Sequence, residues 1–209
     1  GPGSANAIGG QFAFIKTYGR CIDDMIVLAP AAIKIAFGEN PMTNYGNCGN
    51  APSTRMSIAS FIREELFNAR KYFDENKEKD FCMECYRDLF EKKIPLKAHV
   101  HRADDILTAI RIAKEFDLRY SIEHCSDGDI VAEILKRENV AVNLGPTLTD
   151  RSKPELKNLS FDTYKRLSDM GLSVSIITDH PEITIENLPL CAALAVSHGM
   201  DEAKALSAI

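Results

Sequence analysis

The sequence predicts an α/β fold in which parallel strands alternate with helices, arranged as part of a (β/α) barrel. Short apolar runs rich in β-branched residues alternate with helical patterns along most of the chain. Most of these runs are continuously apolar, which is typical of parallel strands that are covered on both faces. Polar residues follow the carboxyl ends of the runs, the face where barrel enzymes place their chemistry.

Six apolar runs are predicted to be strands, and helical segments lie between several of them. The predicted strands are residues 12–16, 33–37, 96–100, 120–123, 141–144 and 173–177. Repeating strand–helix units imply parallel strands joined by right-handed crossovers, either in a doubly wound sheet or in a barrel. A doubly wound nucleotide-binding fold would carry a Gly-rich turn after its first strand, and the sequence has none there, which favours the barrel.

The ends of several helices can be recognised in the sequence. Asp104 and Asp105 precede the apolar-periodic stretch ILTAIRIAKEF, where carboxylates favour a helix N-terminus, and Gly171 follows FDTYKRLSDM as a C-terminal cap. A long helix is predicted from about Thr54, because apolar residues recur there with a period of 3.6. Residues 40–53, rich in Asn, Gly and Pro, are interpreted as a loop that acts as an active-site lid.

The composition excludes several classes of protein. The 209 residues are 45% hydrophobic with a formal net charge of −5, so no basic surface for nucleic acid is expected. No apolar run approaches the ~20 residues that cross a membrane. Six cysteines are too sparse for a disulfide scaffold, which favours a reduced, cytoplasmic setting, and Cys82 and Cys85 are interpreted as ordinary helical thiols. Residues 1–4 resemble a protease-cleavage scar, which leaves residues 5–209 as one domain.

Residues suited to bind a metal stand at or just beyond the ends of the predicted strands. They are Glu39, His99, His101, His124 and Asp179. In a parallel barrel these positions converge on one mouth. Imidazole and carboxylate ligands suit a divalent metal, with zinc expected and manganese or iron as alternatives.

The stretches KIAFGENP, LKAHVHRADDI, SIEH, NLGPTL and ITDHP occur in this order and resemble the metal-dependent amidohydrolase superfamily, especially its imidazolonepropionase-like and prolidase-like branch. The resemblance implies that Glu39 is a bridging carboxylate and that His99 and His124 are the metal ligands of barrel strands 5 and 6. It also implies that Asp179 contacts metal and acts as general base. His101 is expected to contact substrate or to support a ligand, and with His124 to stabilise an oxyanion.

The spacing of these residues agrees with that register. His99 and His124 are 25 residues apart, and His124 and Asp179 are 55 apart, as expected for one and two βα units. The HxH pair of the superfamily's first strand does not precede Glu39. His99-Val100-His101 cannot replace it, because only 108 residues follow in a fold that needs ~250. The chain is therefore expected to hold roughly strands 3 to 8 of an N-terminally truncated barrel.

The resemblance implies that the intact protein hydrolyses amide bonds in a small-molecule substrate, either a cyclic amide or a peptide-like compound. This chain is expected to be inactive or weakly active, because the first HxH pair is missing. The alternative is a non-catalytic metal-binding or scaffold fragment. A metal-free barrel that binds phosphate would need a Gly-rich turn after its last strands, where only Gly145 is present. Exposed strand edges of a partial barrel predict a homo-oligomer.

Overall fold

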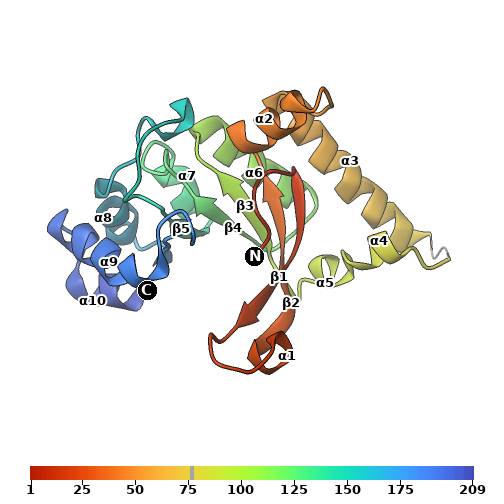
Figure 1. Ribbon diagram of the computed structural model, residues 1–209. Helices are drawn as coiled ribbons and strands as arrows, with labels where there is room; N and C mark the ends of the chain where they lie inside the picture. Colours follow the sequence, from red (N-terminus) through yellow and green to blue (C-terminus); the bar gives the residue numbers. More distant parts are fainter. Residues whose placement is uncertain (76–77) are drawn as a thin grey trace. The chain divides into compact units, whose positions relative to one another are not determined.

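The protein is a mixed α/β fold, and its computed structural model describes residues 1–75 and 78–209 (Figure 1). The described residues fall into two compact units. Unit 1 comprises Gly1–Ala98 and Thr108–Tyr120, and unit 2 comprises His99–Leu107 and Ser121–Ile209. The described strands form a six-stranded sheet in the order β1-β2-β3-β4-β5-β6, which follows the order of the chain.

A strand is present at each of the predicted places, with some changes in boundaries. The strands are β1 (Ile8–Ile15), β2 (Ile26–Ala36), β3 (Leu96–Val100), β4 (Tyr120–His124), β5 (Ala141–Leu144) and β6 (Val174–Ile176). Within unit 2, β4 pairs with β5 and β5 with β6 in parallel. The prediction of parallel pairing is confirmed for these strands.

The prediction of parallel strands is wrong for β1. This strand pairs with β2 in antiparallel register, from Gln11 opposite Ile33 to Ile15 opposite Ile26, and the two form the hairpin drawn in red to orange in Figure 1. Only Lys16 to Met25, which include the short helix α1 (Ile22–Met25), separate the strands. A parallel crossover needs about a dozen residues or more, so this connection can only turn the chain back on itself.

The long helix of unit 1 begins where the sequence predicts. Helix α3 (Arg55–Asp74) follows Thr54, whose side chain accepts a hydrogen bond from the backbone N–H of Ser57. The Ser57 hydroxyl bonds in return to the backbone N–H of Thr54, which completes a capping box. The buried residues of the helix lie three or four positions apart: Ile58, Ile62, Leu66 and Ala69. Their spacing confirms the predicted apolar stripe.

The segment predicted as a structureless lid is largely helical. Helix α2 (Glu39–Asn47) occupies most of it and starts directly after β2 and the turn at Gly38. Pro41 lies in the first turn of this helix, where the missing backbone N–H has no intrahelical partner to lose. The high content of Asn, Gly and Pro favours a loop, but these residues are compatible with one short helix that has proline in its first turn.

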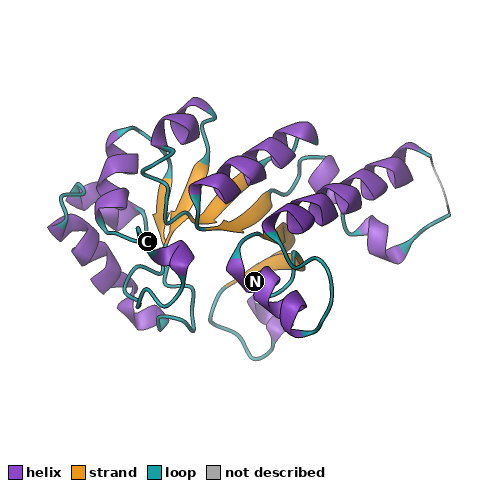
Figure 2. Ribbon diagram, turned by 90° about the horizontal axis from the view of Figure 1, so that it is seen from above, coloured by secondary structure: helices purple, strands orange, loops and turns teal. Residues whose placement is uncertain are grey.

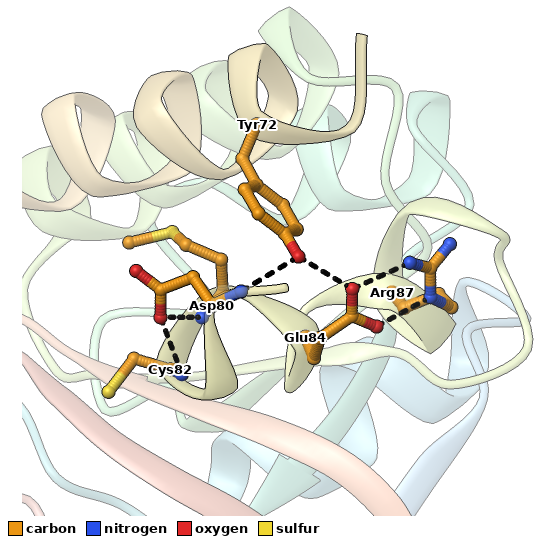
Figure 3. A network of polar contacts seen from close by, with 6 residues as sticks. Tyr72, Asp80, Cys82, Glu84 and Arg87 are labelled. Atoms are coloured by element: carbon orange, nitrogen blue, oxygen red, sulfur yellow. Dashed lines mark hydrogen bonds and ion pairs between the residues drawn. The ribbon is translucent and has the colours of Figure 1, made fainter. Parts of the chain in front are cut away.

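A polar network joins the end of α3 to the two short helices that follow, α4 (Phe81–Glu84) and α5 (Arg87–Phe90) (Figure 3). The Tyr72 hydroxyl donates to Glu84 over 2.8 Å and accepts from the backbone N–H of Asp80 over 3.0 Å. Two nitrogens of Arg87 donate to the same carboxylate, over 2.8 and 2.7 Å. These bonds hold the pKa of Glu84 down, from 4.5 to about 2, chiefly through Arg87 and then through Tyr72.

The stretch FCMECYRDLFEKK around Cys82 and Cys85, predicted as helix, forms the two short helices α4 and α5 rather than one long helix, and Cys85 lies between them. Asp80 caps α4, because its Oδ1 accepts from the backbone N–H groups of Cys82 and Met83. The thiol of Cys85 donates to the carbonyl oxygen of Cys82 over 2.9 Å. Both thiols are free, as are the other cysteines of the chain.

Unit 2 surrounds its parallel strands with helices (Figure 2). Helix α6 (Ala103–Glu115) begins in this unit and ends in unit 1. The others are α7 (Ala132–Arg137), α8 (Asp162–Asp169), α9 (Leu188–Ser197) and α10 (Glu202–Ser207), with 3-10 turns η1 (Pro154–Leu156) and η2 (Ile185–Asn187). The sheet residues Ile122, Val142 and Leu144 belong to the core and are at most 2% exposed. No helix among the described residues has the length and apolarity that a membrane crossing requires.

Candidate metal centre

Two neighbouring strands of unit 2 bring three histidines together. His99 and His101 lie one residue apart at the end of β3, so their side chains point to the same face. His124 is the last residue of β4. All three are buried, at 3%, 6% and 4% exposure respectively. The sequence therefore places imidazoles at adjacent strand ends, where a parallel sheet makes them neighbours.

The three rings form one compact cluster. Their ring centroids are 4.9 Å apart for His99 and His101, 4.4 Å for His99 and His124, and 5.0 Å for His101 and His124. One nitrogen from each ring can be chosen so that all three lie within 4.8 Å of one another. This arrangement allows the three side chains to bind a single ion together.

The tautomer of His124 follows from its hydrogen bond. Its Nδ1 lies 2.6 Å from the carbonyl oxygen of Gly145, at the end of β5. A carbonyl oxygen can only accept, so Nδ1 carries the proton and donates it. The lone pair of Nε2 is then directed away from this bond and is available to a metal, as in most histidine ligands that a backbone carbonyl orients.

His101 lies between two oxygen atoms. Its Nδ1 is 2.8 Å from the hydroxyl oxygen of Ser126, and its Nε2 is 4.0 Å from Oε1 of Glu155. Both neighbours are buried. The loop after β4 and the turn after β5 therefore both reach the same ring.

The backbone takes an unusual conformation at the strand ends of this site. His124 and Cys125 have φ angles of +71° and +52°, and Asp179 after β6 has +52°. Residues with a side chain rarely adopt this region, and such strain clusters at functional sites. At β4 the conformation is held by the backbone N–H of Cys125, which donates to the carbonyl oxygen of Val100 over 2.9 Å.

Asp127 anchors the loop that follows His124. Its carboxylate accepts from the backbone N–H of Ala103 over 2.9 Å and from the side-chain amide of Asn158 over 2.7 Å. Its own backbone N–H donates to the carbonyl oxygen of His101 over 2.9 Å. Asp127 thereby connects three segments near the histidines: the start of α6, the loop after β4 and the segment after β5.

The other predicted site residues are not part of the histidine cluster that the described residues form. Asp179 is exposed in the turn after β6, and the histidine cluster formed by the described residues does not include it. Glu39 belongs to unit 1, where it is the half-buried first residue of α2. Their predicted roles as metal-binding carboxylates, and that of Asp179 as general base, stay predictions.

Sequence reasoning missed the groups that orient the imidazoles. Ser126 and Glu155 both lie in connections after strands, and Gly145 contributes only its backbone carbonyl to His124. Ser126 has a weak signal in the sequence, because it follows His124 by two residues. Glu155 has none, since its approach to His101 depends on the path of the segment after β5.

The donor set fits a divalent metal ion. The cluster offers imidazole nitrogens that are shielded from solvent, and the bond from His124 to Gly145 leaves Nε2 as the acceptor on that ring. Imidazole is a ligand of intermediate softness that suits zinc, iron and nickel among first-row metals. The residues therefore match the metal that the sequence resemblance implies.

One comparison with known proteins agrees with the resemblance seen in the sequence. No protein-family profile and no curated protein sequence match the chain. A crystal structure described as an amidohydrolase from Thermotoga maritima MSB8 matches it with a TM-score of 0.95 and 40% sequence identity. The match covers 98% of this chain and 56% of that one, so the chain spans little more than half the length of the solved protein.

Proposed function

We propose that the chain belongs to the amidohydrolase family and that it serves metal-dependent hydrolysis of amide bonds in a small-molecule substrate. The proposed substrate is a cyclic amide or a peptide-like compound, as the sequence resemblance implies. The buried cluster of His99, His101 and His124 is the observation that carries the proposal. The similarity to an amidohydrolase supports the hydrolytic class, and the cluster supports the dependence on metal.

The proposed fold is a segment of a (β/α) barrel. The parallel strands of unit 2 and the similarity to a longer amidohydrolase support it. Because β1 runs antiparallel to β2, the proposed correspondence with barrel strands begins at β2 rather than at β1. In this proposal β2 to β6 correspond to barrel strands 4 to 8.

The imidazoles of His99, His101 and His124 would hold the metal, for which zinc is proposed, with manganese and iron as alternatives. A divalent metal held there would lower the pKa of a water molecule to about 7 and would polarise a substrate carbonyl. The buried position of the imidazoles excludes bulk water, which strengthens their electrostatic interactions.

Proton transfer is assigned to Asp179 in this proposal. Its carboxylate would take a proton from the attacking water and deliver it to the leaving nitrogen. This role rests on the sequence resemblance. Glu39 is proposed as a further carboxylate of the site, on the sequence resemblance alone.

The experiment that tests the proposal is metal analysis of the purified protein by mass spectrometry. The expected result is near-stoichiometric zinc, manganese or iron in the wild type and its loss in His124→Ala. His198→Ala is the matched control, because His198 lies at the end of α9 and bonds to Asp162. A folded wild type that takes up no metal would reject the proposed metal centre.

A non-catalytic metal-binding or scaffold fragment is the second candidate. The sequence contains no HxH pair before Glu39, and for this reason we propose that the 209-residue chain alone hydrolyses amides weakly or not at all. Slow hydrolysis of a panel of cyclic amides and dipeptides, abolished by a chelator, would favour the enzyme. Stoichiometric metal without any hydrolysis would favour the scaffold.

We further propose that copies of the chain associate. The strand β1 stands at one end of the strand order, and the far end of its hairpin exposes apolar side chains. Phe14, Tyr18 and Val27 are 58%, 89% and 61% exposed. Sedimentation equilibrium should give a dimer or larger species for the wild type and a monomer for Val27→Lys. A monomeric wild type at high concentration would contradict association.

A further inference from the structure

A buried carboxylate lies beside the histidine cluster and has no role in the function proposed so far. Glu155 belongs to the 3-10 turn η1 after β5, and its side chain is 0% exposed. Its Oε1 lies 4.0 Å from Nε2 of His101. Burying an ionised carboxylate is costly unless positive charge or hydrogen bonds compensate for it, so its position beside this ring requires an explanation.

The opposite side of the same ring is also fixed. Nδ1 of His101 lies 2.8 Å from the hydroxyl oxygen of Ser126, which is 3% exposed. The ring further stacks against His124 at a centroid distance of 5.0 Å and an interplanar angle of 22°. The hydroxyl and the neighbouring ring therefore orient His101, and its Nε2, the nitrogen left for a metal, faces the carboxylate of Glu155.

The charge of Glu155 would affect a cation bound by the histidines. Neutral imidazoles bring no negative charge to a bound divalent cation, whereas Glu155 adds one at short range in a buried setting. Other buried carboxylates of unit 2 bind different groups. Glu123 accepts from Ser121 and Asn143, and Asp127 from Ala103 and Asn158. Glu155 faces an imidazole of the cluster.

We propose that Glu155 supplies negative charge to the metal centre: from the Nε2 side of His101 it offsets the charge of the bound cation. This inference rests on the proposed metal-dependent function. Removal of a polar group that lies directly behind the metal ligands commonly changes metal affinity by about 10- to 100-fold. Replacement of Glu155 should therefore weaken metal binding while the cluster of imidazoles is retained.

Cobalt(II) binding to the full chain provides the test, because its visible absorption reports the geometry of the ligands. The dissociation constant is measured by competition with a chelator for the wild type, Glu155→Gln and Glu133→Gln. Glu133 is the matched control, since it undergoes the same chemical change on the exposed side of α7. We expect binding about 10- to 100-fold weaker and a shifted cobalt spectrum in Glu155→Gln only.

Each result decides the proposal. Equal affinity and an equal spectrum in wild type and Glu155→Gln overturn the role of Glu155 while the proposed metal function stands. A wild type that binds no cobalt overturns both together. If Glu155→Gln does not fold, as judged by circular dichroism, Glu155→Asp decides. It keeps the charge but withdraws it by one methylene, and wild-type affinity with a wild-type spectrum in this variant overturns the proposal.

Discussion

Nδ1 of His124 donates its proton to the carbonyl oxygen of Gly145 over 2.6 Å, and this bond joins the ends of β4 and β5. The same glycine makes a close approach on its other side. A Cβ atom at position 145 would lie 2.0 Å from the carbonyl oxygen of Ile177, and φ of Gly145 is +129°. One residue without a side chain therefore meets two requirements, the spacing of two strand ends and the orientation of a histidine.

The first prediction concerns Gly145→Ala. The added methyl group must displace Ile177 or the backbone that orients His124, so we expect a loss of stability greater than ~1 kcal/mol and weaker metal binding. Urea unfolding and the cobalt dissociation constant measure the two effects. Gly171→Ala is the control, because Gly171 has a φ of +81° but no atom near its Cβ position. Similar effects of the two substitutions would show that the close approach at Gly145 is unimportant.

The second prediction separates proton transfer from metal binding. Asp179→Asn keeps the size of the side chain but removes its charge, at an exposed position outside the histidine cluster. We expect metal content to remain near the wild-type value and any chelator-sensitive hydrolysis to fall by about 10²- to 10⁴-fold. His99→Ala should instead lose the metal itself. Metal loss in Asp179→Asn would make this carboxylate a necessary ligand.

The third prediction concerns acid stability. The pKa of Glu84 falls from 4.5 to about 2, first through its bonds with Arg87 and then through Tyr72. A carboxyl group with a lowered pKa in the folded state adds stability that is complete above the unfolded value and is lost as pH falls towards the folded value. The melting temperature of Glu84→Gln should therefore lie below that of the wild type at pH 6. The difference should shrink between pH 4.5 and 2.

Glu133→Gln, on exposed α7, serves as the control for loss of a carboxylate in the third prediction. It should follow the wild type across the same range of pH. A constant difference between Glu84→Gln and the wild type from pH 6 to pH 2 would show that the network in Figure 3 does not depend on the charge of Glu84.

The fourth prediction concerns the start of α3. Thr54→Ala removes the side-chain acceptor of the Ser57 backbone N–H and should lower the free energy of unfolding by about 1 kcal/mol. Ser57→Ala removes the reciprocal bond, and the double variant should cost less than the sum of the two, because both bonds belong to one cap. Urea unfolding of the three variants measures this coupling. Strict additivity would contradict a reciprocal cap.

The histidine cluster could be predicted because it depends on local features. His99, His101 and His124 each follow an apolar run that can only be a strand, and parallel strands align their carboxyl ends. The alternation along β3 also places His99 and His101 on one face without further information. These positions are determined by residues within a few places of each histidine.

Features that depend on distant parts of the chain were not predictable. The sequence predicts a parallel strand at residues 12–16. The direction of this strand depends on the short length of its connection to β2, and the sequence does not predict the first residues of β2, from Ile26, as strand. Glu155 reaches His101 across 54 residues of sequence. Neither periodicity nor spacing in the sequence predicts such a contact, because it depends on how the segment after β5 folds back.

The cap of α3 has a consequence for how the chain can change in length. The side chains of Thr54 and Ser57 cap the first turn of α3 by bonding to each other's backbone. The residue at which α3 begins, and therefore the face that it buries, does not depend on the residues before Thr54. Insertions or deletions among the exposed residues from Gly49 to Ala51 would lengthen or shorten a surface connection, yet Ile58 and Ile62 would still face the core. This short stretch is where the chain can gain or lose residues without shifting the register of its longest helix.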